Sequence, residues 1–178
     1  SGGTGISGAT VYFSATPNAS TTYSIMTTTD ASGNYTQGMP NGTWYVAVAH
    51  PSYNTSADQT VTVNNANVPN INFTMANNAV ISGKVTKQSD GTAIAGATVY
   101  FTKSPTEAAT YTATTNATGD YTQSLQDGVW YVCASATGYR AAPNQMINVS
   151  SSNITGINFP LKAFVRNTPR TSDLFFSV

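Results

Sequence analysis

The sequence predicts an all-β protein made of two tandem β-sandwich domains, and three observations support this prediction. Short runs rich in Val, Tyr, Thr and Phe alternate with clusters of Gly, Asn, Asp and Pro, as strands alternate with turns. No segment shows a helical period beyond one turn. The same blocks also occur twice in the same order, in a unit of about 75–85 residues, which is the size of a small domain.

Six pairs of matching blocks establish the repeat and locate the expected strands. Residues 8–13 match 96–101, 32–37 match 118–123, 44–46 match 130–132, 53 matches 139, 61–63 match 147–149, and 71–73 match 157–159. Gly33 and Gly119 lie in the expected hairpin turns, where glycine supplies a positive φ. Several short strands at regular spacing are typical of a sandwich.

A family resemblance lies in residues 81–86, 91–99, 115–121, 128–132 and 138–139 of the second copy, and most of the first copy shares it. These segments resemble carboxypeptidase regulatory-like domains. The resemblance implies an Ig-like, transthyretin-like (prealbumin) sandwich of seven strands, related to the collagen-adhesin B-type repeats of surface proteins. It also implies a structural and binding module, so it carries over no catalytic activity.

The first copy is expected to lack its opening strand. In the second copy a full strand over 79–86 precedes the segment 89–96, whereas the matching segment of the first copy, 1–8, opens the chain. A sandwich without one strand exposes unpaired backbone groups and an open apolar groove. We therefore expect domain 1 (1–77) to be incomplete and domain 2 (78–163) to be complete. The groove of domain 1 is expected to be lined by Ile6, Val11, Phe13, Trp44 and Val46.

The C-terminal segment 164–178 is expected to form a linker and an additional strand. Leu174, Phe176 and Val178 alternate with Phe175 and Ser177, which is a period-two pattern. The donor strand is expected to contain Leu174, Phe175, Phe176 and Val178. The ten preceding residues reach roughly 33 Å when extended, so this strand could fill the groove of a neighbouring subunit by strand addition.

Such a contact is head to tail and builds open filaments unless it closes into a ring. The predicted function is therefore a structural subunit of an extracellular, pilus-like surface fibre that polymerises by donor-strand complementation, with copies of itself as partners. Two other interpretations of the tail remain open, since it could lead to a third domain of a longer repeat protein or fold back onto its own first domain. The alternative function is an adhesive or carbohydrate-binding accessory module of a larger secreted protein.

Composition excludes several other classes of protein. Only 8% of residues are charged and the formal net charge is zero, so no basic surface for nucleic acid is expected. No apolar run approaches the roughly 18 residues of a membrane span. Cys133 is the single cysteine, so no intrachain disulfide can form. One histidine and no nucleophile–base motif argue against an enzyme and against cofactors.

Metal and cross-link sites have little support in the sequence. Asp30, Asp120 and Asp127 are explained by their positions in turns, so no metal site is expected. The resemblance to adhesin repeats raises the question of a Lys–Asn isopeptide bond. Lys84 and Asn158 form the only suitable pair, and no helper acid is evident.

Asn-x-Ser/Thr sequons are frequent and make the chain a candidate glycoprotein. The candidate N-glycosylation sites are Asn18, Asn34, Asn41, Asn54, Asn116, Asn148 and Asn153. An eighth sequon at Asn72 lies in a predicted strand and is the weakest. The alternative is a surface that is simply rich in Ser, Thr and Asn. Covalent N-glycans would place the protein outside the cell or on its surface.

Overall fold

The computed structural model describes residues 3–164, so the predicted donor strand over 171–178 lies outside the described residues. The chain forms two compact units, and the first boundary between them falls after Val80. Each repeat is described by itself as domain 1, which contains β1 to β4, and domain 2, which contains β5 to β11.

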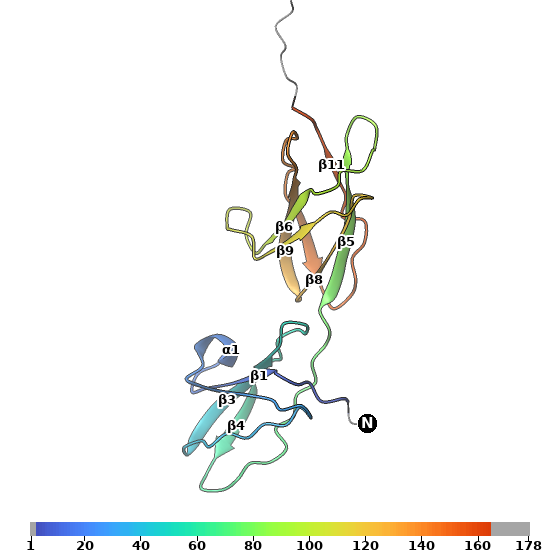
Figure 1. Cartoon of the computed structure of the whole chain (residues 1–178). Helices are drawn as coiled ribbons and strands as arrows, with labels where there is room; N and C mark the ends of the chain where they lie inside the picture. The colour runs from blue at the N-terminus through green and yellow to red at the C-terminus, as the bar shows by residue number, and fades with distance from the viewer. Residues whose placement is uncertain (1–2, 165–178) are drawn as a thin grey trace, which may run out of the picture. The chain divides into compact units, whose positions relative to one another are not determined.

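Domain 2 is a sandwich of a four-stranded sheet and a three-stranded sheet (Figure 1). The four-stranded sheet has the order β10-β9-β6-β7 and the three-stranded sheet has the order β11-β5-β8. The strands are β5 Ala79–Lys87, β6 Thr98–Thr102, β7 Tyr111–Thr114, β8 Asp120–Leu125, β9 Gly128–Ser135, β10 Gln145–Val149 and β11 Phe159–Leu161. The seven strands agree with the sandwich that the family resemblance implies.

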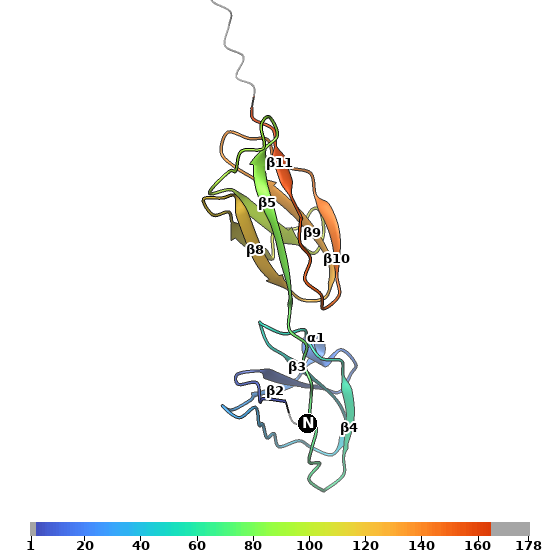
Figure 2. The same ribbon diagram turned by 90° about the vertical axis from the view of Figure 1, so that its right-hand side faces the viewer.

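Strand β5 is the central strand of the three-stranded sheet and lies between β8 and β11 (Figure 2). Its alternate residues Ala79, Ile81 and Val85 are buried at 1% exposure or less, because successive side chains of a strand point to opposite faces. Strand β11 pairs with β5 in parallel, with Phe159 opposite Val85 and Leu161 opposite Lys87. The inward face of β5 thus forms part of the domain 2 core.

Domain 1 has a four-stranded sheet of the same design, with the order β2-β1-β3-β4. Its strands are β1 Thr10–Ser14, β2 Ile25–Thr28, β3 Gly42–Ala49 and β4 Gln59–Val63, and a single helical turn, α1 Ala19–Thr22, follows β1. The registers agree between the domains, since Tyr12 lies opposite Ala47 and Tyr100 lies opposite Cys133. The repeat in the sequence is therefore a repeat in structure.

The three-stranded sheet has no counterpart among the described residues of domain 1. The segments 34–39 and 71–75, which match β8 and β11, form no strand there. The reason is that β5 is the middle strand of its sheet, so without an equivalent strand neither neighbour has a partner. Among residues 3–164, no strand of domain 1 takes the place that β5 has in domain 2, and the two segments that would neighbour it form no strand either.

Candidate functional site

An open cavity of about 1350 Å³ lies along domain 1, on the inner side of its sheet. Protein interiors are normally close-packed, so a space of this size is a groove and not a packing defect. It is lined by the inner face of the sheet, by residues 32–39 (the tyrosine segment) and by residues 66–75 (the wall segment). Residues 3–6 and Thr29, Tyr53 and Asn77 complete the lining. None of the lining residues is charged.

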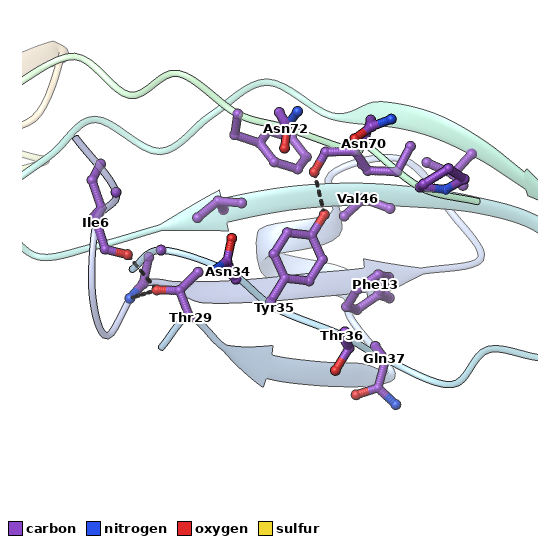
Figure 3. A pocket seen from close by; sticks show the side chains of 18 of the residues that line it. Ile6, Phe13, Thr29, Asn34, Tyr35, Thr36, Gln37, Val46, Asn70 and Asn72 are labelled. Atoms are coloured by element: carbon purple, nitrogen blue, oxygen red, sulfur yellow. Dashed lines mark hydrogen bonds between the residues drawn. The ribbon is translucent and has the colours of Figure 1, made fainter. Parts of the chain in front are cut away.

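Four of the five residues predicted for the groove line it, namely Ile6, Phe13, Trp44 and Val46. Val11 is not among the lining residues and is instead fully buried in the core of domain 1. Figure 3 shows the side chains of Ile6, Phe13 and Val46 around the cavity. Trp44 is half-buried, and its Nε1 donates a hydrogen bond to the Pro40 carbonyl oxygen at 3.1 Å.

The opposite wall of the groove was not anticipated from the sequence. It contains Tyr35 of the tyrosine segment and Ile71, Phe73 and Met75 of the wall segment. The available signal was the repeat, because these residues match Tyr121, Ile157, Phe159 and Leu161 of domain 2.

The apolar side chains of these walls are less buried in domain 1 than their counterparts are in domain 2. In domain 2, Leu125, Phe159 and Leu161 are exposed by 1% or less. Their counterparts in domain 1, Met39, Phe73 and Met75, are only half-buried. Apolar surface that remains open to water is unfavourable by about 25 cal/mol per Å², so the groove favours an apolar occupant.

A hydrogen bond joins the tyrosine segment to the wall segment. The Tyr35 hydroxyl donates to the Ile71 carbonyl oxygen at 2.7 Å, and we call this bond the tether (Figure 3). In domain 2 the Tyr121 hydroxyl donates to the Ile157 carbonyl oxygen at 2.6 Å. Burial raises the pKa of both phenols, Tyr35 and Tyr121. The tyrosine segment and the wall segment are therefore joined at the same matched positions as their counterparts in domain 2.

Two further side chains fix the groove in the same way in both domains. The Thr29 hydroxyl donates to the Ile6 carbonyl oxygen at 2.6 Å and accepts a hydrogen bond from the Ala9 N–H at 2.9 Å (Figure 3). Thr115 makes the equivalent bonds in domain 2. The Gln59 side chain donates to the Asn72 carbonyl oxygen at 2.7 Å, as its counterpart does in domain 2.

Other kinds of site have little support among residues 3–164. In the described part of the chain, no three His, Cys, Asp or Glu side chains gather closely enough to hold a metal ion. No helix between residues 3 and 164 has the length and apolar character of a membrane span. Trp130 is 1% exposed, so its ring faces are not available for stacking with a sugar. Burial raises the pKa of the Cys133 thiol.

The lysine considered for an isopeptide bond has other partners. Lys84 Nζ lies 2.8 Å from Asp120 Oδ1 and donates to the Thr118 carbonyl oxygen at 2.6 Å. Asn158 Oδ1 instead accepts a hydrogen bond from the Lys84 backbone N–H at 2.8 Å. In this arrangement the lysine forms an ion pair and the asparagine holds the strand backbone.

The sequon asparagines lie mostly on the surface. Asn54 is half-buried. The exposed candidates are Asn18, Asn34, Asn41, Asn116, Asn148 and Asn153. Asn72, the weakest candidate, is also exposed and lies on the wall segment beside the groove (Figure 3). Exposure permits glycan attachment at these positions, and occupancy stays a prediction.

Comparison of the chain with known protein families divides it into the same two domains. The model of the carboxypeptidase regulatory-like domain matches residues 1–76 and 80–162. The chain belongs to this family. Each of its two carboxypeptidase regulatory-like domains thus corresponds to one repeat. No curated protein sequence matches the chain.

Solved structures of pilins are similar to the pair of carboxypeptidase regulatory-like domains. A streptococcal ancillary pilin matches with a TM-score of 0.52 and 14% identity, over 90% of this chain and 59% of the pilin. The shaft pilin SpaA of Lactobacillus rhamnosus GG matches with a TM-score of 0.46 and 13% identity, over 90% of this chain and 86% of the pilin. The chain therefore spans less than two thirds of the ancillary pilin, and the likeness shows a shared β-sandwich fold.

Proposed function

We propose that the protein is a structural subunit of an extracellular, pilus-like fibre, in which residues 171–178 of one copy fill the groove of domain 1 in the next. The observation that carries this proposal is the open, uncharged groove at the place where domain 2 holds β5. Strand addition supplies a partner for the backbone groups and covers the half-buried apolar walls. The ancillary pilin, whose fold is similar, is itself a pilus protein by name.

The C-terminal tail is the favoured occupant because of its sequence. It combines a period-two apolar pattern with the short spacer of residues 164–170. Burial of Leu, Phe and Val side chains contributes about 1.5–3 kcal/mol each before ordering entropy is subtracted. A groove that receives the tail of another copy, whose own groove receives a third, propagates a head-to-tail polymer.

Deletion of residues 171–178 tests the proposal. We expect the full chain to form filaments in electron micrographs and the deletion variant to remain monomeric in size-exclusion chromatography. The described domains should keep the unfolding temperatures that they have in the monomeric full chain. Filaments that persist after the deletion would contradict the proposal. Monomers throughout, together with a clear signal on a glycan array, would instead favour an adhesive or carbohydrate-binding module.

N-glycosylation is a separate part of the proposal. Exposed sequons on both domains support covalent glycans on a secreted fibre subunit. Mass spectrometry of peptides from the native protein is expected to show hexose-containing modifications on several sequon asparagines. Unmodified peptides at all of these positions would remove the glycan part and leave the fibre proposal intact.

A further inference from the structure

Domain 2 shows what a strand that fills this sandwich must contain. Gly83 of β5 lies against the hydrogen bond between the Tyr121 hydroxyl and the Ile157 carbonyl oxygen. A Cβ atom added to Gly83 would overlap that carbonyl oxygen and lie 3.0 Å from the Tyr121 hydroxyl oxygen. Every amino acid except glycine has this atom, so alanine and serine are excluded as firmly as leucine. The fit of β5 therefore depends on glycine itself and not on a small side chain.

The tether of domain 1 has the same geometry, although no strand of domain 1 among residues 3–164 takes the place of β5. The Tyr35 ring lies 6.3 Å from the Phe13 ring at an interplanar angle of 60° (Figure 3). The matching rings of domain 2, Tyr121 and Phe101, lie 6.1 Å apart at 58°. The phenol of domain 1 is therefore held as it is in a filled sandwich.

The carbonyl end of the tether is held in the same way. Asn70, directly before Ile71, has φ of 64°, and Gly156 at the matching position of domain 2 has φ of 79°. Positive φ is uncommon for residues other than glycine, so its recurrence indicates that the two backbones follow the same path. Directly after Ile71, the Asn72 carbonyl oxygen accepts a hydrogen bond from the Gln59 side chain at 2.7 Å. The tether is thus a preformed feature of the groove.

The C-terminal tail has no residue that fits against the tether. Residues 164–178 contain no glycine. A tail strand that spans the groove in the place of β5 puts one of its residues against the tether, whatever its frame. The Cβ atom of that residue meets both atoms of the hydrogen bond, and an overlap of this kind is relieved only by a shift of the backbone. The Tyr35 hydroxyl and the Ile71 carbonyl therefore have to separate before the tail is seated.

We propose that the tether determines which strands the groove accepts, with Tyr35 as the specificity-determining residue. A strand with glycine at the position of Gly83 enters with the tether intact, whereas the C-terminal tail enters only when the tether opens. This inference rests on the proposed function and adds an opening step to it. The loss of one hydrogen bond is smaller than the gain from burial of several apolar side chains, so entry of the tail stays favourable.

The opening step has a measurable consequence for affinity. The tail binds only those grooves whose tether is open, so its apparent affinity is reduced by the fraction of open grooves. Tyr35→Phe removes the tether, and the tail then binds without this reduction. A strand with glycine binds the tethered groove, so it gains nothing from the substitution. The same change in the protein thus separates the two kinds of strand.

Two peptides test this difference on the variant that lacks residues 171–178. The tail peptide comprises residues 171–178, and the β5 peptide comprises residues 79–87. With Tyr35→Phe, isothermal titration calorimetry is expected to show a roughly two- to tenfold lower dissociation constant for the tail peptide, as one hydrogen bond predicts. The dissociation constant of the β5 peptide should stay within about twofold or rise. An equal change for both peptides, or weaker binding of the tail peptide, would overturn the role of the tether and leave the proposed function standing.

Variants of the β5 peptide test the glycine requirement without any change to the protein. Gly83→Ala is expected to weaken binding roughly tenfold or more, because its Cβ atom overlaps the wall carbonyl. Ser82→Ala, at the neighbouring outward position, is the matched control and should stay within about twofold of the original peptide. The penalty for Gly83→Ala should be smaller on the Tyr35→Phe protein. Equal affinities of the two variant peptides, or no binding of the original β5 peptide, would overturn the glycine requirement.

Polymerisation of the full chain gives a second readout. Tyr35→Phe is expected to lower the critical concentration for filaments roughly two- to tenfold. Tyr121→Phe is the matched control, since β5 already has glycine at that position, and it should leave the critical concentration within about twofold. A higher critical concentration for Tyr35→Phe would overturn the inference. Filaments that form without residues 171–178 would instead overturn the proposed function itself.

Discussion

Domain 1 and domain 2 share a four-stranded sheet with the same strand order and register, yet only domain 2 has a second sheet among the described residues. The difference traces to one strand, β5, which lies in the middle of that second sheet. A missing central strand removes the pairing of both its neighbours. The comparison shows that sequences typical of strands form a sheet only when their partner is present.

The largest expected effect comes from giving domain 1 its own first strand. A copy of residues 79–91 placed directly before Thr4 reproduces the spacing found in domain 2. Burial of the grafted Ile and Val is expected to contribute about 3–6 kcal/mol before ordering entropy. Domain 1 should unfold at a higher temperature in calorimetry, and filament growth should stop because the groove is filled.

The matched control is the same graft carrying Ile81→Asn and Val85→Asn, which keeps the backbone donors and removes the apolar side chains. This version is expected to leave the unfolding of domain 1 close to its original temperature. A graft that gives no stabilisation in either version would show that the groove does not accept a strand.

The second prediction concerns a substitution that disturbs the packing of β5, the strand that domain 1 lacks among its described residues. Gly83→Val places a branched side chain against the Ile157 carbonyl oxygen and the Tyr121 hydroxyl. Overpacking of this kind costs about 1–3 kcal/mol or more, so the midpoint of denaturant unfolding for domain 2 should fall. Ser82→Val, on the neighbouring outward position, should change it by less than about 0.5 kcal/mol. Equal effects of the two changes would show that β5 has no tight contact at Gly83.

A third pair of variants compares the two tyrosine hydrogen bonds. Tyr121 is 3% exposed, so Tyr121→Phe removes the donor to the Ile157 carbonyl oxygen in a site with little access to water and is expected to destabilise domain 2 by about 1–3 kcal/mol. Tyr35→Phe should destabilise domain 1 by less, about 0.5–1.5 kcal/mol, because water in the open groove can replace the hydroxyl. Chemical denaturation of both variants measures the difference. A larger effect in domain 1 would mean that its groove is closed to water.

Acidification is expected to have the smallest effect. Hydrogen bonds from the backbone of Asn34 and Ser32 lower the pKa of Asp30, and Lys84 lowers the pKa of Asp120. A carboxyl whose pKa is lower in the folded state contributes stability above its unfolded pKa, and this contribution is lost as the pH falls. The pKa values of Asp90 and Asp127 are lowered as well. Since three of the four carboxyls belong to domain 2, this domain should lose more stability below about pH 4.

Unfolding curves at pH 7 and pH 3 measure that difference. Asp120→Asn removes one of the lowered carboxyls, so the variant should show a smaller loss between the two pH values than the original protein. An identical loss would mean that the pKa of Asp120 is the same in the folded and unfolded states.

The repeat made most of the fold predictable from the sequence. Matched blocks located the strands of the four-stranded sheet in both domains, because each has its partners within the same repeat. The segments 35–37 and 71–73 were predicted as strands by the same logic, and they form none in domain 1 because their shared partner is missing. Periodicity describes a single segment and says nothing of the presence of its neighbour.

The groove was only partly predictable for a related reason. Ile6, Phe13, Trp44 and Val46 line the cavity, the last three on strands that the repeat located, and their role as an acceptor groove stays a prediction. Val11 lies in the core and not along the cavity, since the alternation of side chains does not show how deep in the core each one lies. The tether between Tyr35 and Ile71 joins residues 36 positions apart, and no local pattern connects them.

The place of β5 in the chain has a consequence for the cost of completing each sandwich. Strand β5 begins at Ala79, directly after the segment that ends domain 1, so it is covalently joined to the domain that it fills. A tethered partner acts at an effective concentration in the millimolar range or above, and domain 2 is therefore complete at any dilution. A strand supplied by another molecule has only the bulk concentration of that molecule. On this basis domain 2 is a permanent unit, whereas the closure of domain 1 would respond to how much protein surrounds it.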